Sequence, residues 1–407
     1  MKLPVAILAI SLATTFAADW PQWRGANRND TSSEVGLLKQ WPAGGPKRLW
    51  LFENAGTGYA GFSVADGKLF VMGTRDDKEV LMALDANTGK EIWAAPLAGI
   101  LSNGWGDGPR GTPTVDGDRV YTISGTGTIT CTNVADGKAV WSKTMKDLGG
   151  SVPGWGYTES PLVDGKLVVL TPGGNKGTMA ALDKMTGAPV WQSADITEGA
   201  QYSSIIPATV GGKKQYVQLV MQTLFGVDPE SGKVIWRTPW SGKTAVIPSP
   251  IVKGDEVFVS SGYGAGSKKV KIAGSEATDV FLNKDLSNHH GGVILVGDYL
   301  YGHSDKGGWT CMSWADGSVK WQDKGVGKGA IGYADGMLYC LGEKDGTVAL
   351  VAATPDGWKE SGRFKLEPLS THRNPKGGIW VHPVIANGKL YLRDQEFICC
   401  YDVKGTP

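Results

Sequence analysis

The stretch ALDANTGKEIW, residues 83–93, decides how this chain folds. A small residue, Ala83, is followed by Asp85, by Gly89 four residues after the aspartate, and by Trp93 eight residues after it. Aspartate can bond the backbone of a tight turn, and glycine adopts the positive φ that such a turn needs. The stretch therefore predicts a strand, a turn and a second strand that carries the tryptophan.

The same spacing recurs along the chain. It is found again at residues 131–141, 181–191, 226–236 and 311–321, with Asn or Ser in place of Asp in the first and last of these. An alternating apolar hairpin lies upstream of each unit, as at residues 64–71, so each period holds four strands. A buried aromatic of ~150 to 250 Å² would lock one sheet to the next. The expected docking residues are Trp50, Trp93, Trp141, Trp191, Trp236 and Trp321.

Counting the periods predicts an all-β, eight-bladed β-propeller with four-stranded antiparallel blades. Two periods separate Trp236 from Trp321, which implies a degenerate fifth blade at about residues 247–286. The last unit, residues 382–403, holds three strands, and residues 46–52 at the other end carry Trp50 and supply the missing fourth. Closing the ring in this way removes the exposed sheet edge. Seven blades remain the alternative if the fifth unit is only an insertion.

The N-terminus has the layout of a cleavable secretory signal, with Lys2, an apolar run and small residues at Ala17 and Ala18. We expect a signal peptide at residues 1–18, a single propeller domain at residues 19–407, and a periplasmic or secreted protein without a transmembrane segment. The 41 Lys and Arg residues balance 40 Asp and Glu residues, which argues against a nucleic-acid partner. Five cysteines are too few and odd in number for a disulfide framework.

The tandem Ala-x-Asp-x-x-x-Gly-Lys-x-x-Trp pattern resembles the PQQ-like repeat family. That family includes quinoprotein dehydrogenases and outer-membrane assembly scaffold propellers. Two further motifs, residues 20–25 (WPQWRG) and residues 288–292 (NHHGG), look like a branch of exported propellers within it. The resemblance covers essentially the whole mature chain and implies the fold much more strongly than any activity.

Loops that enter the innermost strands of a propeller meet at the mouth of its central funnel, where ligand sites usually form. In this chain the segments before those strands are rich in aromatic and ionisable groups, and three of the five histidines fall there. The candidate binding residues are Arg110, Trp155, Tyr157, Glu159, Tyr202, Asn288, His289, His290, Lys328, Trp380 and His382. The alternative is that these groups only bond one another and ordered water.

Resemblance to quinoprotein alcohol dehydrogenases implies one version of this site, with PQQ stacked on a tryptophan beside Ca²⁺. The residues that would hold the cofactor and the ion in this version are Glu159, Asn288, Arg110, Lys328 and Trp380. Those enzymes also carry an adjacent cysteine pair beside the cofactor. The only such pair here, Cys399 and Cys400, should point to opposite faces of a strand, and no catalytic aspartate is placed. Whether the protein is an enzyme of this type therefore stays open.

Three other interpretations of the function are compatible with the same sequence. Glu159, Asn288, His290 and His382 are candidate ligands for a metal ion. Alternatively, the aromatic side chains form stacking platforms for a glycan or another small molecule, with Arg110 and Lys328 holding its carboxylate or sulfate. Finally, the propeller could be a non-catalytic scaffold whose loops bind envelope protein partners.

Overall fold

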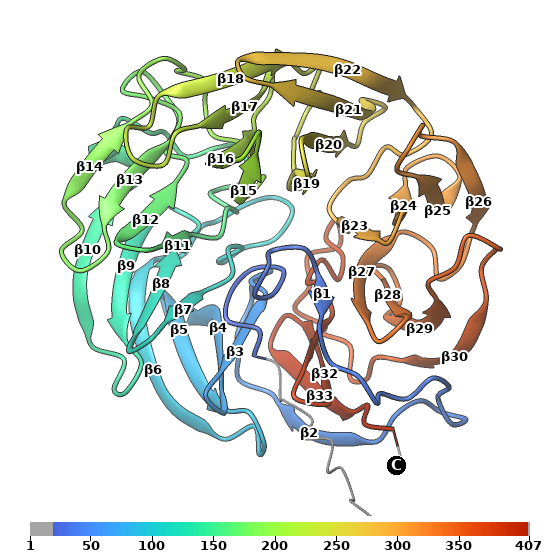
Figure 1. Cartoon of the computed structure of the whole chain (residues 1–407). Helices are drawn as coiled ribbons and strands as arrows, with labels where there is room; N and C mark the ends of the chain where they lie inside the picture. Colours follow the sequence, from blue (N-terminus) through green and yellow to red (C-terminus); the bar gives the residue numbers. More distant parts are fainter. Residues whose placement is uncertain (1–18, 406–407) are drawn as a thin grey trace, which may run out of the picture.

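The computed structural model describes residues 19–405, which form a closed ring of eight sheets (Figure 1). In seven of the sheets the strands run in sequence order from the centre of the ring to its outer edge, and in the eighth the outermost strand is β2, from the N-terminal region. The predicted all-β, eight-bladed propeller is confirmed, and the seven-blade alternative is wrong. The expected signal peptide, residues 1–18, lies outside the described residues. Within the described part, no helix is long and apolar enough to cross a membrane.

The first four blades follow one another along the chain. Blade 1 consists of β3 (Phe62–Ala65), β4 (Lys68–Arg75), β5 (Lys78–Asp85) and β6 (Glu91–Gly99). Blade 2 consists of β7 (Thr114–Asp116), β8 (Arg119–Ile123), β9 (Thr128–Asn133) and β10 (Ala139–Thr144), and a 3₁₀ turn (Met145–Leu148) follows it. Blade 3 consists of β11 (Leu162–Asp164), β12 (Leu167–Leu170), β13 (Ala180–Asp183) and β14 (Pro189–Gln192). Blade 4 consists of β15 (Ile206–Val210), β16 (Lys213–Leu219), β17 (Thr223–Val227) and β18 (Val234–Pro239).

The other four blades complete the ring. Blade 5 consists of β19 (Ile251–Lys253), β20 (Glu256–Ser261), β21 (Gly266–Ala273) and β22 (Glu276–Asn283). Blade 6 consists of β23 (Val293–Val296), β24 (Tyr299–Ser304), β25 (Gly308–Ser313) and β26 (Val319–Asp323). Blade 7 consists of β27 (Gly329–Ala334), β28 (Met337–Gly342), β29 (Thr347–Ala352) and β30 (Glu360–Lys365). Blade 8 consists of β31 (Val384–Ala386), β32 (Lys389–Asp394), β33 (Phe397–Asp402) and, from the N-terminal region, β2 (Arg48–Phe52).

Blade 8 closes the ring with strands from both ends of the chain, as the sequence predicted. Strand β2 pairs antiparallel with β33, with Trp50 opposite Cys400 and Leu51 opposite Cys399. The side chains of Cys399 and Cys400 enter the hydrophobic cores on opposite faces of this blade. All five cysteines are buried and free, in agreement with the expectation that no disulfide framework holds the fold.

The predicted docking tryptophans lie on the outermost strands. In five of the six, the indole Nε1 donates to a backbone carbonyl oxygen of the next blade: Trp50 to Ala86 (3.3 Å), Trp93 to Val134 (3.0 Å), Trp141 to Lys184 (2.9 Å), Trp191 to Pro229 (2.9 Å) and Trp321 to Thr354 (2.8 Å). Trp236 instead donates to Gln215 Oε1 of its own blade at 2.7 Å. That exception faces blade 5, which lacks the motif. On the outer strand of blade 5, Phe281 takes the place of the tryptophan and covers Gly317 of blade 6.

The N-terminal segment passes through the centre of the ring before it reaches β2 (Figure 1). Trp20 bridges Val64 on the inner strand of blade 1, and β1 (Thr31–Ser32) pairs in parallel with β27 of blade 7. Between these two anchors, Arg28 donates to the carbonyl oxygens of Ser160 (2.9 Å) and Pro161 (3.2 Å) at the start of blade 3. The segment therefore contacts blades 1, 3 and 7 and ties together blades on opposite sides of the ring.

Candidate functional site

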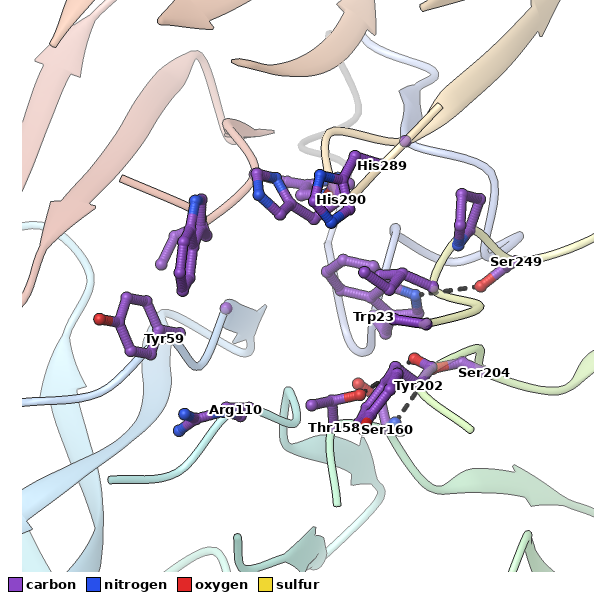
Figure 2. A pocket seen from close by; sticks show the side chains of 18 of the residues that line it. Trp23, Tyr59, Arg110, Thr158, Ser160, Tyr202, Ser204, Ser249, His289 and His290 are labelled. Atoms are coloured by element: carbon purple, nitrogen blue, oxygen red, sulfur yellow. Dashed lines mark hydrogen bonds between the residues drawn. The ribbon is translucent and has the colours of Figure 1, made fainter. Parts of the chain in front are cut away.

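A cavity of about 290 Å³ lies at the mouth of the funnel, and Trp23 and Arg24 of the N-terminal segment are among the residues that line it (Figure 2). Its walls come mostly from the loops that precede the innermost strands, which is the level at which the sequence placed a site. Seven of the predicted binding residues line it: Arg110, Trp155, Tyr202, His289, His290, Trp380 and His382. The arrangement brings side chains of seven blades around one space.

Aromatic rings form a continuous wall along one side of this cavity (Figure 2). Tyr263 contacts His289 with the ring centroids 4.5 Å apart, and His289 stacks on His290 at 4.5 Å. The wall continues from His290 to Trp380 at 5.0 Å and from Trp380 to Tyr59 at 4.8 Å. Rings that pack on one another in this way are held rigidly and offer flat, apolar surfaces for a ligand.

A second pair of rings faces this wall. The centroids of Trp155 and Tyr202 are 5.7 Å apart, and the Tyr202 hydroxyl accepts from the Trp155 backbone N–H at 3.3 Å. Trp105 stands at the rim with 45% of its surface exposed, and its carbonyl oxygen accepts from the Tyr59 hydroxyl at 3.0 Å. The mouth of the cavity is thus bordered by aromatic groups on both sides.

Arg110 ends the aromatic wall with a positive charge. Its Nη1 and Nη2 donate to the carbonyl oxygens of Gly108 and Gly106, each at 2.7 Å, and its guanidinium lies 5.2 Å from the centre of the Tyr59 ring. Among the described residues no carboxylate forms an ion pair with it. Burial lowers the pKa of this guanidinium, a sign that the charge is poorly solvated. A half-buried arginine of this kind favours an anionic ligand.

The floor of the cavity is a buried charged cluster that includes the N-terminal segment. Arg24 Nε lies 2.6 Å from Asp30 Oδ2, which is also 3.0 Å from His382 Nδ1. The other ring nitrogen, His382 Nε2, is 2.9 Å from the carbonyl oxygen of His290. Burial opposes ionisation of Asp30, but Arg24 and His382 outweigh it and lower the pKa of this carboxyl. His382 therefore supports the floor with both ring nitrogens engaged, and Trp23 packs on its ring at 4.6 Å.

The neighbouring histidines are uncharged at neutral pH. Burial and Lys328 lower the pKa of His289, and burial and His289 hold the pKa of His290 well below its usual range. Lys328 does not line the cavity, but its Nζ contacts His289 Nδ1 from behind. On the other side, His290 Nε2 lies 3.3 Å from Glu343 Oε2.

Three further predicted residues do not line the cavity and are almost fully buried. The Tyr157 hydroxyl donates to the carbonyl oxygens of Ser151 or Pro172, at 3.1 and 3.0 Å. Glu159 accepts from the backbone N–H of Thr171 at 2.6 Å and from its hydroxyl at 2.8 Å. Asn288 Nδ2 donates to the carbonyl oxygens of Gly292 (3.0 Å) and His303 (2.9 Å). These contacts position the loops rather than face a ligand.

The residues present do not fit a quinone held beside calcium. Glu159 is committed to Thr171, and within residues 19–405 no three histidine, cysteine or carboxylate side chains lie close enough to hold a metal ion. The adjacent pair Cys399 and Cys400 lies in the third strand of blade 8, buried in two separate cores.

Several cavity residues were missed from the sequence. Tyr59 precedes β3 as Arg110 precedes β7, so aligning the loops of all blades would have found it. Trp23 and Arg24 belong to the N-terminal WPQWRG motif, which was noted for its resemblance but given no place in the site. Tyr263 lies in the hairpin between β20 and β21, where no repeated pattern pointed to it.

Comparison with known proteins places this architecture in a family. A family model described as outer membrane protein assembly factor BamB matches residues 77–323. Outer membrane protein assembly factor BamB of Yersinia pestis is 24% identical over 336 residues, which span 79% of this chain and 68% of that protein. The serine/threonine-protein kinase AfsK of Streptomyces griseus is 29% identical over 61% of this chain, but over only 30% of the kinase.

A solved structure shows the same fold. Quinohemoprotein alcohol dehydrogenase from Comamonas testosteroni matches with a TM-score of 0.64 and 11% identity, over 96% of this chain and 81% of its own. At that identity the likeness concerns the fold alone. The eight blades, the repeated docking motif and the family model agree with one another, and the chain belongs to the PQQ-like β-propeller family described as outer membrane protein assembly factor BamB.

Proposed function

We propose that this protein binds a flat, negatively charged small molecule, an aromatic acid or an acidic sugar, in its funnel cavity. The observation that carries the proposal is Arg110, a half-buried guanidinium without a carboxylate partner among the described residues, at the end of a wall of stacked rings. A carboxylate on the ligand would pair with this charge, and its flat body would stack on Tyr59 and Trp380. Lys328 lies behind His289 and adds positive charge to the same region.

Ligand titrations with matched compounds test this proposal. Fluorene-2-carboxylate and oligogalacturonate represent the two ligand types, and fluorene-2-methanol and a cello-oligosaccharide are their neutral counterparts. We expect a saturable rise in melting temperature with at least one of the anionic compounds, because a ligand that binds only the folded state stabilises it. Quenching of tryptophan fluorescence should follow the same binding curve, since Trp23, Trp105, Trp155 and Trp380 line the cavity. No shift with either anionic compound would contradict the proposal.

Two variants locate the binding. Arg110→Met keeps a long apolar side chain but removes the charge, and it should weaken binding of the anionic compound roughly tenfold or more. Lys138→Met removes a positive charge from an exposed turn of blade 2 and should leave the affinity unchanged. Equal effects of the two substitutions would indicate a general charge effect rather than a site at Arg110.

Binding of envelope proteins is a second candidate function, which the family description supports. The aromatic rim would be the contact surface, because Trp105 and Tyr263 are exposed there. Cross-linking in intact cells through a photoreactive residue at position 105 would test it. A defined adduct with one envelope protein, lost when fluorene-2-carboxylate fills the cavity, would favour this candidate.

Both candidates assume export, and we propose that residues 1–18 are removed to leave one propeller domain at residues 19–407. The layout of the N-terminal sequence supports this. Mass spectrometry of the protein recovered from the periplasm or the medium should give an N-terminus directly after Ala17 or Ala18. An intact Met1 on cytoplasmic material would contradict it.

A further inference from the structure

A row of four side chains, joined by two hydrogen bonds and one ion pair, ends in the funnel cavity. The Tyr263 hydroxyl lies 2.8 Å from His289 Nε2, and Lys328 Nζ contacts the other ring nitrogen, Nδ1. Behind them, Asp305 Oδ1 is 3.5 Å from Lys328 Nζ. The four residues come from the neighbouring blades 5, 6 and 7, so the row forms only where these three blades pack side by side.

The row fixes where the protons are. An ammonium group carries donors only, so Lys328 donates to Nδ1 and leaves the proton of a neutral His289 on Nε2. Burial and the positive charge of Lys328 lower the pKa of His289, whereas Asp305 opposes this effect. The neutral ring then donates its Nε2–H to the Tyr263 oxygen. Because that oxygen is already an acceptor, its own O–H remains free to point elsewhere.

The backbone of Tyr263 is held in place for this role. Tyr263 has a φ of 58°, a conformation that is uncommon for a residue with a side chain, and its N–H donates to Asp305 Oδ2 at 3.0 Å. Asp305, at one end of the row, thus also holds the backbone of Tyr263 at the other end. Tyr263 lines the cavity, and within residues 19–405 its hydroxyl has no hydrogen-bond partner besides His289. Non-glycine residues held in such a conformation are often found at ligand sites.

We propose that Tyr263 is a hydrogen-bond donor subsite that binds an oxygen acceptor of the ligand, such as a ketone carbonyl. The inference rests on the proposed function and narrows it. The ligand would be a flat acid with a carboxylate for Arg110 of the blade 2 entry loop and a carbonyl for Tyr263 of blade 5. His289 and Lys328 act as positioning residues, since they orient the tyrosine proton toward the cavity. A hydroxyl group that receives a hydrogen bond is also a better donor, because successive hydrogen bonds polarise one another.

Nitrogen NMR of the histidine rings tests the row without any ligand. In protein labelled with ¹⁵N-histidine, the signals of His289 are assigned by their loss in His289→Gln. We expect a neutral ring protonated at Nε2 at neutral pH. Lys328→Met should change the tautomer ratio or raise the pKa of this ring, because the donor to Nδ1 and its charge are removed. A wild-type ring protonated at Nδ1 would overturn the proposal.

A matched pair of ligands tests the subsite. Compounds 9-oxofluorene-2-carboxylate and fluorene-2-carboxylate differ by one carbonyl, and wild-type protein should prefer the ketone roughly tenfold. Tyr263→Phe should remove this preference, whereas Arg110→Met should weaken both compounds equally. An equal affinity for both in the wild type, or a preference that survives in Tyr263→Phe, would overturn the subsite. Failure of both compounds to bind would instead contradict the aromatic-acid form of the proposed function, on which this subsite rests, and the nitrogen signals would still decide the proton arrangement.

Discussion

Trp191 of blade 3 covers Gly232 of blade 4 so closely that a β-carbon added at Gly232 would lie 2.4 Å from the indole. The same contact joins Trp50 to Gly89, Trp93 to Gly137, and Trp141 to Gly187. The glycine and the tryptophan of the repeated motif are therefore two halves of one joint, but each meets its counterpart from the neighbouring repeat. This explains why both recur together in a chain whose blades are otherwise different.

Alanine substitutions in blade 4 should separate the two roles of a motif glycine. Gly232 and Gly212 have φ values of +70° and +72°, so Gly232→Ala and Gly212→Ala impose similar backbone strain. Only Gly232 faces an indole, whereas nothing lies within 4 Å of a β-carbon at Gly212. We expect Gly232→Ala to lose about 1 to 3 kcal/mol more in urea unfolding, because it also overpacks the joint. Equal losses would mean that the turn, not the tryptophan contact, requires glycine.

Removing the other half of the joint should also destabilise the ring. Trp191 is 9% exposed, and truncating a buried aromatic to alanine costs about 3 to 5 kcal/mol. Val190 precedes it on the same strand and is 52% exposed, so Val190→Ala should change stability by less than about 0.5 kcal/mol. Chemical denaturation of both variants gives the comparison. An unchanged unfolding midpoint for Trp191→Ala would show that the tryptophan does not dock the blades.

The sequence predicted the ring because its signal is local and repeated. The turn residues, the spacing of the motif and the N-terminal strand with Trp50, which has no partner strand next to it in the sequence, can all be read from this one sequence. Strand β2 pairs with β33 as expected. The fifth blade was harder to recognise, since Phe281 takes the place of tryptophan and no single residue type marks that joint. Trp236 was assigned a docking role, yet its indole bonds within its own blade because the motif is absent from the next.

The charged floor of the cavity should be essential for stability. Asp30→Asn leaves the buried Arg24 without a carboxylate and removes the negative charge beside His382. Breaking a buried pair on one side costs about 3 to 5 kcal/mol, because the remaining charge has no counterion. Asp356→Asn is the control, since Asp356 pairs with Lys359 at the exposed surface and should contribute little. Similar unfolding free energies for the two variants would contradict the buried pair.

Glu159 should make stability depend on pH. Burial raises the pKa of this carboxyl to about 7, against an ordinary value of 4.5. A raised pKa favours the neutral acid in the folded state, so its contribution is greatest below about pH 4.5 and falls until about pH 7. Glu159→Gln cannot titrate. Relative to this variant, wild-type stability should therefore fall by about 3 kcal/mol over that range, in denaturation curves at several pH values. A constant difference would show that Glu159 ionises normally.

The sequence predicted the level at which the cavity lies but not the direction of each side chain. Thr158 and Ser160 line the cavity, whereas their neighbours Tyr157 and Glu159, which were the predicted binding residues, point into the packing between loops. In an extended segment, successive side chains point to opposite sides, so every second residue faces the cavity. Only the three-dimensional arrangement shows which of the two sets of residues faces it. Tyr263 could not be found in this way, because it reaches the cavity from a hairpin rather than from an entry loop.

Two adjacent residues of one loop should respond in opposite ways to alanine substitution. Asn288 is 1% exposed and bonds two carbonyl oxygens, so Asn288→Ala should lower the melting temperature because these acceptors lose their donor. His289 is half-buried and stacks on the cavity wall, so His289→Ala should leave melting nearly intact and weaken binding of fluorene-2-carboxylate. Thermal unfolding and a fluorescence titration of both variants decide the matter. A large loss of stability in His289→Ala, with unchanged affinity, would make this histidine a structural residue and remove it from the proposed site.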